Sequence, residues 1–221
     1  MFGKNLKLKP EYMTSTVLKV TQIFNTFQGE GPFVGYPAVF IRLSGCNLAC
    51  TFCDTEFDNY TEYSVEEIIY KIESDTIVKR PLIVITGGEP MRQNISLLCQ
   101  KLLDRKYIVQ IESNGTLIAP NLPNGVKIVC SPKIINGQYH KIRPDVLEKT
   151  IAIKFLISAY EQYYCDIDDV GQHDYNIPTY VQPMDEYDAE KNASNLTLAM
   201  SITRKNGVIL SLQMHKMIGI D

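Results

Sequence analysis

Short apolar runs rich in β-branched residues recur along this 221-residue chain, and loops or helical patterns separate them. Their length and composition are typical of buried strands. Strands are expected at eight places: 17–24, 38–44, 82–86, 107–113, 127–131, 151–157, 179–184 and 208–213. Because helical patterns alternate with these runs, the sequence predicts an α/β fold with a parallel sheet covered by helices, and a partial β/α barrel fits best.

Three longer segments show helical periodicity. Residues 64–74 begin with Ser64 followed by Glu67, the spacing of a capping box, and their aliphatic residues repeat at intervals of three and four. Further helices are expected at 94–106 and at 189–207, and Gly207 is expected to cap the end of the second.

Length and composition bound the class of protein. With 45% hydrophobic residues, the chain is expected to form one domain over 1–221, in which residues 1–15 are a loosely held polar lead. No apolar run approaches the roughly 20 residues of a membrane span, and the first ten residues lack the apolar core of a signal peptide, so we expect a cytoplasmic protein. A net charge of −3 without basic runs makes nucleic acid a poor candidate for a direct partner.

Unusual loops follow five of the expected strands. The strand at 38–44 runs into a cysteine-rich loop, and the later strands run into "GGEP", "NGT", "PK" and "PMD". In parallel α/β folds the carboxyl ends of the strands meet at one edge and carry the chemistry. We therefore expect the five loops to share one functional mouth.

Three of the six cysteines, Cys46, Cys50 and Cys53, lie within eight residues with the spacing C-x3-C-x2-C. In a reducing compartment such a cluster indicates metal binding or catalysis and argues against a disulfide framework. Structural zinc is one interpretation, although zinc sites usually combine two C-x2-C pairs and no second pair is present. An iron–sulfur cluster held by three thiolates is the other, and it leaves one iron open for chemistry.

The cysteine motif, with Phe52 in its aromatic position, resembles the signature of the radical S-adenosylmethionine (SAM) superfamily. The resemblance implies a 4Fe–4S cluster held by these three cysteines, with SAM chelating the fourth iron, and a partial barrel of the radical SAM type. "GGEP" at 87–90 is similar to the SAM loop of that superfamily, where Gly88 would let the backbone approach SAM and Glu89 would meet its ammonium group. Taken alone, "GGEP" is an ordinary turn.

Longer strings extend the likeness over nearly the whole chain. The stretch "FQGEGPFVGYPAVFIRLSGCNLACTFCDT" (27–55), with "ESNGT", "CSPK", "YVQPMD" and "LSLQMHKMIGID", is similar to the 7-carboxy-7-deazaguanine synthase family. That resemblance implies a lyase that removes hydrogen from C6 of 6-carboxy-5,6,7,8-tetrahydropterin, contracts the ring with loss of ammonia to 7-carboxy-7-deazaguanine, and regenerates SAM, in queuosine and deazapurine biosynthesis. It also implies a homodimer and an electron donor such as flavodoxin or ferredoxin.

The same resemblance implies the residues that contact SAM. Besides Gly88 and Glu89, the expected contacts are Phe52, Cys53, Asp54, Ser131, Pro132, Lys133, Gln182, Pro183, Met184 and Asp185. Without the resemblance, the stretches at 131–133 and 182–185 are turns that end strands.

Arg42 stands between Ile41 and Leu43 in an expected strand, where a guanidinium needs a partner. A substrate carboxylate would satisfy it, and so would an ordinary internal ion pair. The substrate contacts implied by the resemblance are Phe27, Gln28, Gly29, Arg42, Thr86 and the terminal Asp221, where the family commonly has proline. Read by themselves, the glycines of "QGEGP" indicate a tight turn between two strands.

Three further roles complete the expected site. Glu30 is a candidate proton acceptor or hydrogen-bond partner, and His215 a candidate catalytic residue, although a lone histidine is more often structural. The resemblance implies that Thr55 binds Mg²⁺ together with substrate oxygens, as suits a hard cation with few protein ligands. Chemistry alone favours a helix N-cap or a loop hydroxyl for Thr55.

Two other functions share parts of this pattern. A radical SAM activase would use the same cysteines to form a glycyl radical on a partner protein, and it would need neither Arg42 nor the "QGEGP" loop. A zinc-stabilised binding module would be colourless and indifferent to air. Net consumption of SAM separates the synthase from the activase, and a brown absorbance separates it from the zinc protein.

Overall fold

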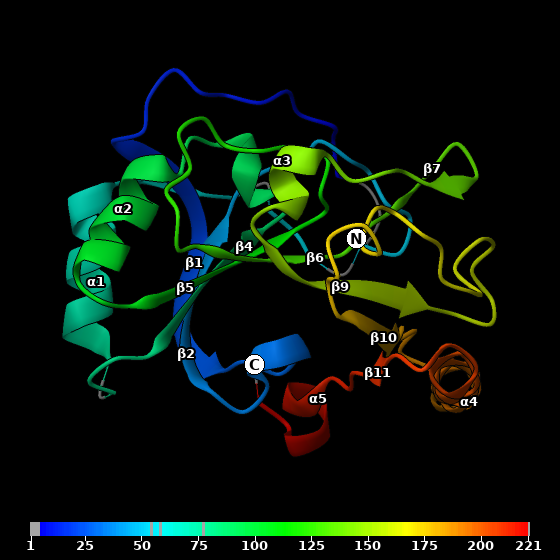
Figure 1. Ribbon diagram of the computed structural model, residues 1–221. Helices are drawn as coiled ribbons and strands as arrows, with labels where there is room; N and C mark the ends of the chain where they lie inside the picture. Colours follow the sequence, from blue (N-terminus) through cyan, green and yellow to red (C-terminus); the bar gives the residue numbers. More distant parts are fainter. Residues whose placement is uncertain (1–4, 54, 58, 77, 221) are drawn as a thin grey trace. The chain divides into compact units, whose positions relative to one another are not determined.

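The computed structural model describes residues 5–53, 55–57, 59–76 and 78–220 (Figure 1). Its contacts divide the chain into two compact units. Unit 1 comprises Met1–Gln28, Gly35–Ser113 and Leu117–Ile128. Unit 2 comprises Gly29–Val34, Asn114–Thr116 and Val129–Asp221. The assignment of the whole chain to a single domain stays a prediction.

Five strands of unit 1 adjoin in the order β3-β1-β2-β4-β5. Their bounds are β1 Val17–Phe27, β2 Pro37–Leu43, β3 Thr61–Ser64, β4 Leu82–Gly87 and β5 Ile108–Ser113. As expected, β2, β4 and β5 are parallel, but β1 runs antiparallel to both β2 and β3. The expectation of a parallel sheet is corrected at this side, because the connection from β1 to β2 is too short for a parallel crossover.

Strand β4 shows why the parallel strands could be predicted from the sequence. Its residues Leu82 to Ile85 are all buried, as is typical of a strand that is covered on both faces. Because β2, β4 and β5 are parallel neighbours, their carboxyl ends lie at the same edge. The loops that follow β2 and β4 therefore lie at one edge of unit 1, whereas Asn114–Thr116, directly after β5, belong to unit 2. That all five loops share one mouth stays a prediction.

The helices of unit 1 are α1 (Val65–Asp75) and α2 (Ser96–Asp104), with a 3₁₀ turn η2 at Pro90–Arg92. The predicted capping box is present, because Ser64 Oγ accepts from the Glu67 backbone N at 3.2 Å and Glu67 Oε2 accepts from the Ser64 N at 2.7 Å. Figure 1 shows α1 and α2 on the same side of the strands, and the two helices contact each other.

Unit 2 contains three parallel strands in the order β9-β10-β11. Its elements are the strands β7 Ile134–Ile135, β8 Gln138–Tyr139, β9 Thr150–Ile157, β10 Thr179–Pro183 and β11 Ile209–Leu210, and the helices η1 Gly31–Phe33, α3 Pro144–Leu147, α4 Ala189–Asn206 and α5 Met214–Ile218. Strand β6 (Lys127–Cys130) begins in unit 1 and ends in unit 2.

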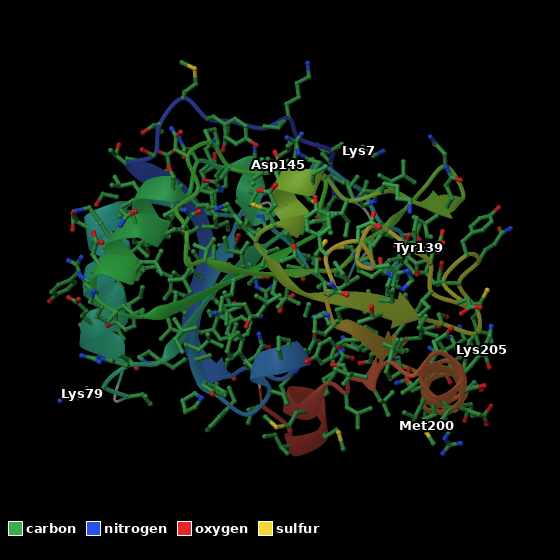
Figure 2. The ribbon with its side chains drawn as sticks, viewed as in Figure 1. Lys7, Lys79, Tyr139, Asp145, Met200 and Lys205 are labelled. Carbon is green, nitrogen blue, oxygen red and sulfur yellow. The ribbon has the colours of Figure 1, made fainter. Side chains whose placement is uncertain are left out.

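The long helix α4 packs beside β10 and β11 (Figure 1). Asp188 caps its first turn by accepting from two backbone N–H groups, and Gly207 ends it in the left-handed conformation at φ 65°, as predicted. Lys205, labelled in Figure 2, lies in the last turn, where a cation is favourable beside unpaired carbonyl groups.

The N-terminal segment differs from the expected loosely held lead. Leu8 N donates to Cys46 O at 2.8 Å, and Glu11 N donates to Arg92 O at the same distance. Backbone pairing fixes this segment on unit 1 before β1 begins. In the described part of the chain, no helix has both the length and the apolar character that a membrane crossing needs.

Candidate active site

The cysteine loop, residues 44–57, follows β2 in unit 1. Its second residue, Gly45, has a left-handed conformation at φ +84°, and a turn is closed where Cys53 N donates to Cys50 O at 3.2 Å. Cys46, Cys50 and Cys53 are half-buried thiols. The three predicted ligands thus lie on one short loop at the carboxyl end of a strand.

Gly88 and Glu89 lie directly against the start of this loop. Glu89 N donates to Gly45 O at 3.0 Å. A Cβ atom on Gly88 would lie 2.4 Å from Gly45 O and 2.7 Å from the Cβ of Cys46, so only glycine permits this approach. The structure therefore joins the predicted SAM loop to the first cysteine.

The Glu89 side chain is fully buried. Its Oε1 accepts from the backbone N of Met91 at 3.1 Å and from Ser113 Oγ at 2.9 Å. Two fixed donors, one from η2 and one from the end of β5, hold the carboxyl group in place. Such a group is suited to an ammonium partner.

The pKa of the Cys46 thiol is raised to about 11, chiefly by burial and also by nearby Glu89, Cys50 and Cys53, against the lowering effect of the Leu48 N–H. A bound metal would lower this pKa, because a cation stabilises thiolates. Among the described side chains, no three Cys, His, Asp or Glu residues gather around a single ion position. A 4Fe–4S cluster does not need such convergence, since each of its thiolates binds a different iron. The donors present fit that cluster.

Arg42, Thr55 and Thr86 come together in unit 1. Arg42 Nη1 donates to Thr55 Oγ1 at 3.3 Å, and the guanidinium carbon lies 5.9 Å from the ring centre of Phe24. Arg42 on β2 pairs in register with Thr86 on β4, so their side chains point to the same face of the sheet. Phe24 was not among the predicted site residues.

Gln28 is buried and closes the link between β1 and β2. Its N donates to Tyr36 O, its O accepts from Gly35 N, and its Nε2 donates to Glu112 Oε1 at 3.4 Å. Glu112 also accepts from Gln110 Nε2 at 2.6 Å. Gln110 and Glu112 were missed, although two polar residues in the apolar run "YIVQIES" were a visible signal. Phe27, the last residue of β1, is exposed.

In unit 2, Glu30 forms an ion pair with Lys154 of β9 and accepts from Gln213 Nε2 at 2.9 Å. Burial by itself would raise the pKa of Glu30, but the charge and hydrogen bond of Lys154 lower it to about 2, helped by Gln213 and Gln182. Glu30 is therefore an ionised acceptor with little affinity for a proton. Lys154 was missed, although a lysine inside "IAIKFLI" is the same signal that pointed to Arg42.

His215 packs against Gly29 in the same unit. A Cβ atom on Gly29 would lie 2.0 Å from His215 Nδ1, and Met214 N donates to Gly29 O at 2.9 Å. Gly31 N donates to Ser211 Oγ at 3.1 Å, which extends this contact along the loop. The "QGEGP" segment is thus joined to the C-terminal segment, and Gly29, Glu30 and His215 lie together.

The predicted SAM contacts at 131–133 and 182–185 also belong to unit 2. Lys133 Nζ donates to the backbone O and to Oγ of Ser131, both at 2.8 Å, beside the buried Pro132. Ser211 Oγ donates to Gln182 Oε1 at 3.1 Å. Asp185 accepts from Lys216 Nζ at 2.5 Å.

Asp185 is held by further donors in its loop. Burial tends to raise its pKa, but hydrogen bonds from Lys216, Tyr187 and Asn192 lower it. Pro183 is the last residue of β10, and Met184, directly after it, donates its N–H to Ile157 O at 2.8 Å. Phe52 lies half-buried in the cysteine loop. The predicted contacts Asp54 and Asp221 lie outside the described residues.

Comparison with known proteins places these features in a family. The model of the radical SAM superfamily matches residues 40–151. A protein of Rickettsia prowazekii named 7-carboxy-7-deazaguanine synthase is 50% identical over 226 residues, covering 100% of this chain and 96% of the relative. One of the same name from Rhodospirillum rubrum is 34% identical over 240 residues, with 100% of both chains covered.

The fold agrees with these sequence relatives. The crystal structure of QueE from Escherichia coli superimposes with a TM-score of 0.71 at 25% identity, covering 90% of this chain and 95% of that one. The predicted α/β class, with mostly parallel strands, flanking helices and a fold of the radical SAM type, is confirmed by this match. The chain belongs to the 7-carboxy-7-deazaguanine synthase family of the radical SAM superfamily.

Proposed function

We propose that this protein is a lyase that converts 6-carboxy-5,6,7,8-tetrahydropterin to 7-carboxy-7-deazaguanine, in queuosine and deazapurine biosynthesis. Relatives of that name match the full length of the chain. The observation that carries the proposal is the contact of Gly88 and Glu89 with Gly45 and Cys46, which joins the two motifs that a radical SAM enzyme requires.

Membership of the superfamily implies a 4Fe–4S cluster and SAM. When bound, these two groups supply the radical that removes a hydrogen atom from the substrate. Cys46, Cys50 and Cys53 would hold the cluster, and the fixed carboxyl group of Glu89 would bind the ammonium group of SAM beside the open backbone of Gly88. Further SAM contacts are proposed for Phe52, Asp54, Ser131, Pro132, Lys133, Gln182, Pro183, Met184 and Asp185.

Arg42 is proposed to bind the substrate carboxylate, because a guanidinium offers two parallel donors to it. Thr55, which accepts from Arg42, would also ligate Mg²⁺ with substrate oxygens. Phe27, Gln28, Gly29, Thr86 and Asp221 are the other proposed substrate contacts. Glu30 is ionised, so it is assigned as a hydrogen-bond acceptor, and His215 is assigned to the substrate side of Gly29.

The proposal is tested by anaerobic reconstitution with iron and sulfide, then incubation with SAM, a reductant, Mg²⁺ and the carboxypterin. We expect 7-carboxy-7-deazaguanine to accumulate without net consumption of SAM, and Cys50→Ser to abolish both the brown absorbance and the product. A protein that binds the cluster and consumes one SAM per turnover would contradict the synthase. A colourless protein loaded with zinc would contradict any radical SAM activity.

Three finer proposals concern the surroundings of the enzyme. A homodimer, a flavodoxin or ferredoxin as electron donor, and a cytoplasmic location follow from the family resemblance and the cysteine-rich site. Sedimentation of the reconstituted protein tests the first, and replacement of the chemical reductant by each reduced carrier tests the second. A product rate that neither carrier supports would remove the second proposal.

A further inference from the structure

The N-terminal strap, residues 5–12, crosses the cysteine loop and the loop after β4 in unit 1. Lys7, labelled in Figure 2, pairs with Cys46 in a parallel bridge, and Leu8 N donates to Cys46 O at 2.8 Å. Farther along, Glu11 pairs with Gln93 and donates its N–H to Arg92 O at 2.8 Å. One continuous segment is therefore bonded to the first cysteine and to the turn that follows Glu89.

The Arg92 side chain holds the strap on unit 1 by hydrogen bonds. It is 3% exposed, and it donates from Nη1 to Lys9 O at 3.0 Å and from Nη2 to Glu11 Oε1 at 3.0 Å. It also donates to Ser44 O at 3.2 Å, at the start of the cysteine loop. A Cβ atom on Gly45 would lie 2.7 Å from Arg92 Nε, so the guanidinium is packed on the backbone beside Cys46.

Asn5, the first residue of the strap, contacts the last of the three clustered cysteines. Its Nδ2 donates to Cys53 Sγ at 3.5 Å and to Thr55 O at 3.0 Å. A side-chain amide has two N–H groups, so both contacts can exist together. Asn5 is thus a protein donor aimed at a sulfur that the proposed function assigns to the cluster.

We propose that Asn5 is a positioning residue for the iron–sulfur cluster and that the strap holds the cysteine loop in its cluster-binding form. The proposal rests on the assignment of Cys53 as a ligand. Hydrogen bonds to the sulfur atoms of a cluster make reduction easier, because they stabilise the additional negative charge. Groups that orient metal ligands also slow the loss of the metal, and their removal typically costs 10–100-fold in affinity.

The test uses the full chain, reconstituted anaerobically, with three variants. Asn5→Ala removes the donor, Asn5→Gln keeps an amide on a longer side chain, and Asn206→Ala is the matched control. Asn206 Nδ2 donates to a backbone carbonyl, Ile202 O, at 2.9 Å at the end of α4 in unit 2. The readouts are the midpoint potential of the cluster and the rate at which its visible absorbance is lost in the presence of a chelator.

For Asn5→Ala we expect a lower midpoint potential and a cluster loss about tenfold faster than in the parent. Asn5→Gln should recover part of both effects, and Asn206→Ala should match the parent. A general loss of folding would shorten the lifetime of the cluster but would not shift its potential. Thermal unfolding of the apo forms measures that loss separately.

Two outcomes would overturn the inference, and they differ in what they say of the enzyme. If the parent binds the cluster and Asn5→Ala leaves its potential and lifetime unchanged, Asn5 does not position the cluster and the proposed function stands. If the parent binds no iron–sulfur cluster, the proposed function fails and the inference fails with it.

Discussion

Lys154 and Glu30 form an ion pair in the interior of unit 2, with side-chain exposures of 6% and 18%. The lysine comes from the middle of β9 and the glutamate from the loop before η1. Gln213, just before α5, donates to the other carboxylate oxygen at 2.9 Å. The pair therefore links the "QGEGP" segment, a central strand and the C-terminal segment.

Removing the lysine should destabilise the protein strongly. Lys154→Met leaves the Glu30 carboxylate buried without its cation, and breaking a buried pair in this way costs about 3–5 kcal/mol. Urea unfolding of the apo protein measures the loss. The double variant Lys154→Met/Glu30→Gln should recover much of it, because no buried charge remains. A double variant less stable than Lys154→Met would show that lost packing, and not the orphaned charge, dominates.

The same pair predicts an acid dependence of stability. The pKa of Glu30 falls from its ordinary 4.5 to about 2, so its stabilising contribution is complete above pH 4.5 and is lost as the pH falls toward 2. The full contribution is on the order of 3 kcal/mol, from 1.36 kcal/mol per pKa unit. Urea unfolding of the parent and of Glu30→Gln over this range isolates it. A gap between the two proteins that does not narrow with falling pH would contradict the assignment.

The central strands were predictable because their apolar runs coincide with burial on both faces, as in Leu82 to Ile85 of β4. The β7–β8 hairpin was missed because each strand has two residues. Its turn, Asn136-Gly137, has φ values of 54° and 83°, and this dipeptide is a strong hairpin signal that sequence reasoning had not used. Helix α5 was missed because it is one short turn with no buried residue.

The site was predictable where a motif carries a local meaning, as in the cysteine loop and "GGEP". Contacts between distant residues were not, since no periodicity relates Lys154 to Glu30 or Asn5 to Cys53. The polar N-terminal lead seemed loose for the same reason, because its partners are mostly backbone carbonyl groups of Cys46 and Arg92 or the Arg92 side chain. Every residue has a backbone carbonyl group, so a hydrogen bond to one cannot be predicted from the type of the partner residue.

Gly29→Ala should displace His215. The new Cβ would lie 2.0 Å from His215 Nδ1, and such overpacking costs about 1–3 kcal/mol when neighbours must move. We expect an unchanged cluster absorbance with at least tenfold lower product formation. The double variant Gly29→Ala/His215→Ala removes the clash, so its stability should return toward that of His215→Ala. A double variant as unstable as Gly29→Ala would place the strain elsewhere.

Gly88→Ala should impair cluster binding, because its Cβ would lie 2.4 Å from Gly45 O and push the cysteine loop away. The expected result is a several-fold lower iron content after reconstitution. Gly125→Ala is the control in the same unit, since its nearest neighbour atom is 3.6 Å away. Its φ of +100° makes it cost about 1–2 kcal/mol in strain. If both variants lose iron equally, general destabilisation is the cause and not contact with Cys46.

Thr55 offers a way to separate magnesium binding from a simple hydrogen bond. Thr55→Ser keeps the hydroxyl that accepts from Arg42 at 3.3 Å, whereas Thr55→Val keeps the shape and removes the hydroxyl. If Thr55 ligates Mg²⁺, Thr55→Val should raise the Mg²⁺ concentration for half-maximal product formation by about tenfold or more, since a site with few protein ligands depends on each of them.

The control for this experiment is the other partner of the hydroxyl. Arg42→Met leaves the Thr55 hydroxyl in place and removes its donor, so it should weaken the apparent affinity for the carboxypterin while the Mg²⁺ requirement stays near that of the parent. Measuring product formation against each ligand in turn distinguishes the two effects. An unchanged Mg²⁺ requirement in Thr55→Val would restrict Thr55 to orienting the Arg42 guanidinium, because a hydroxyl that binds the cation cannot be lost without weakening its affinity.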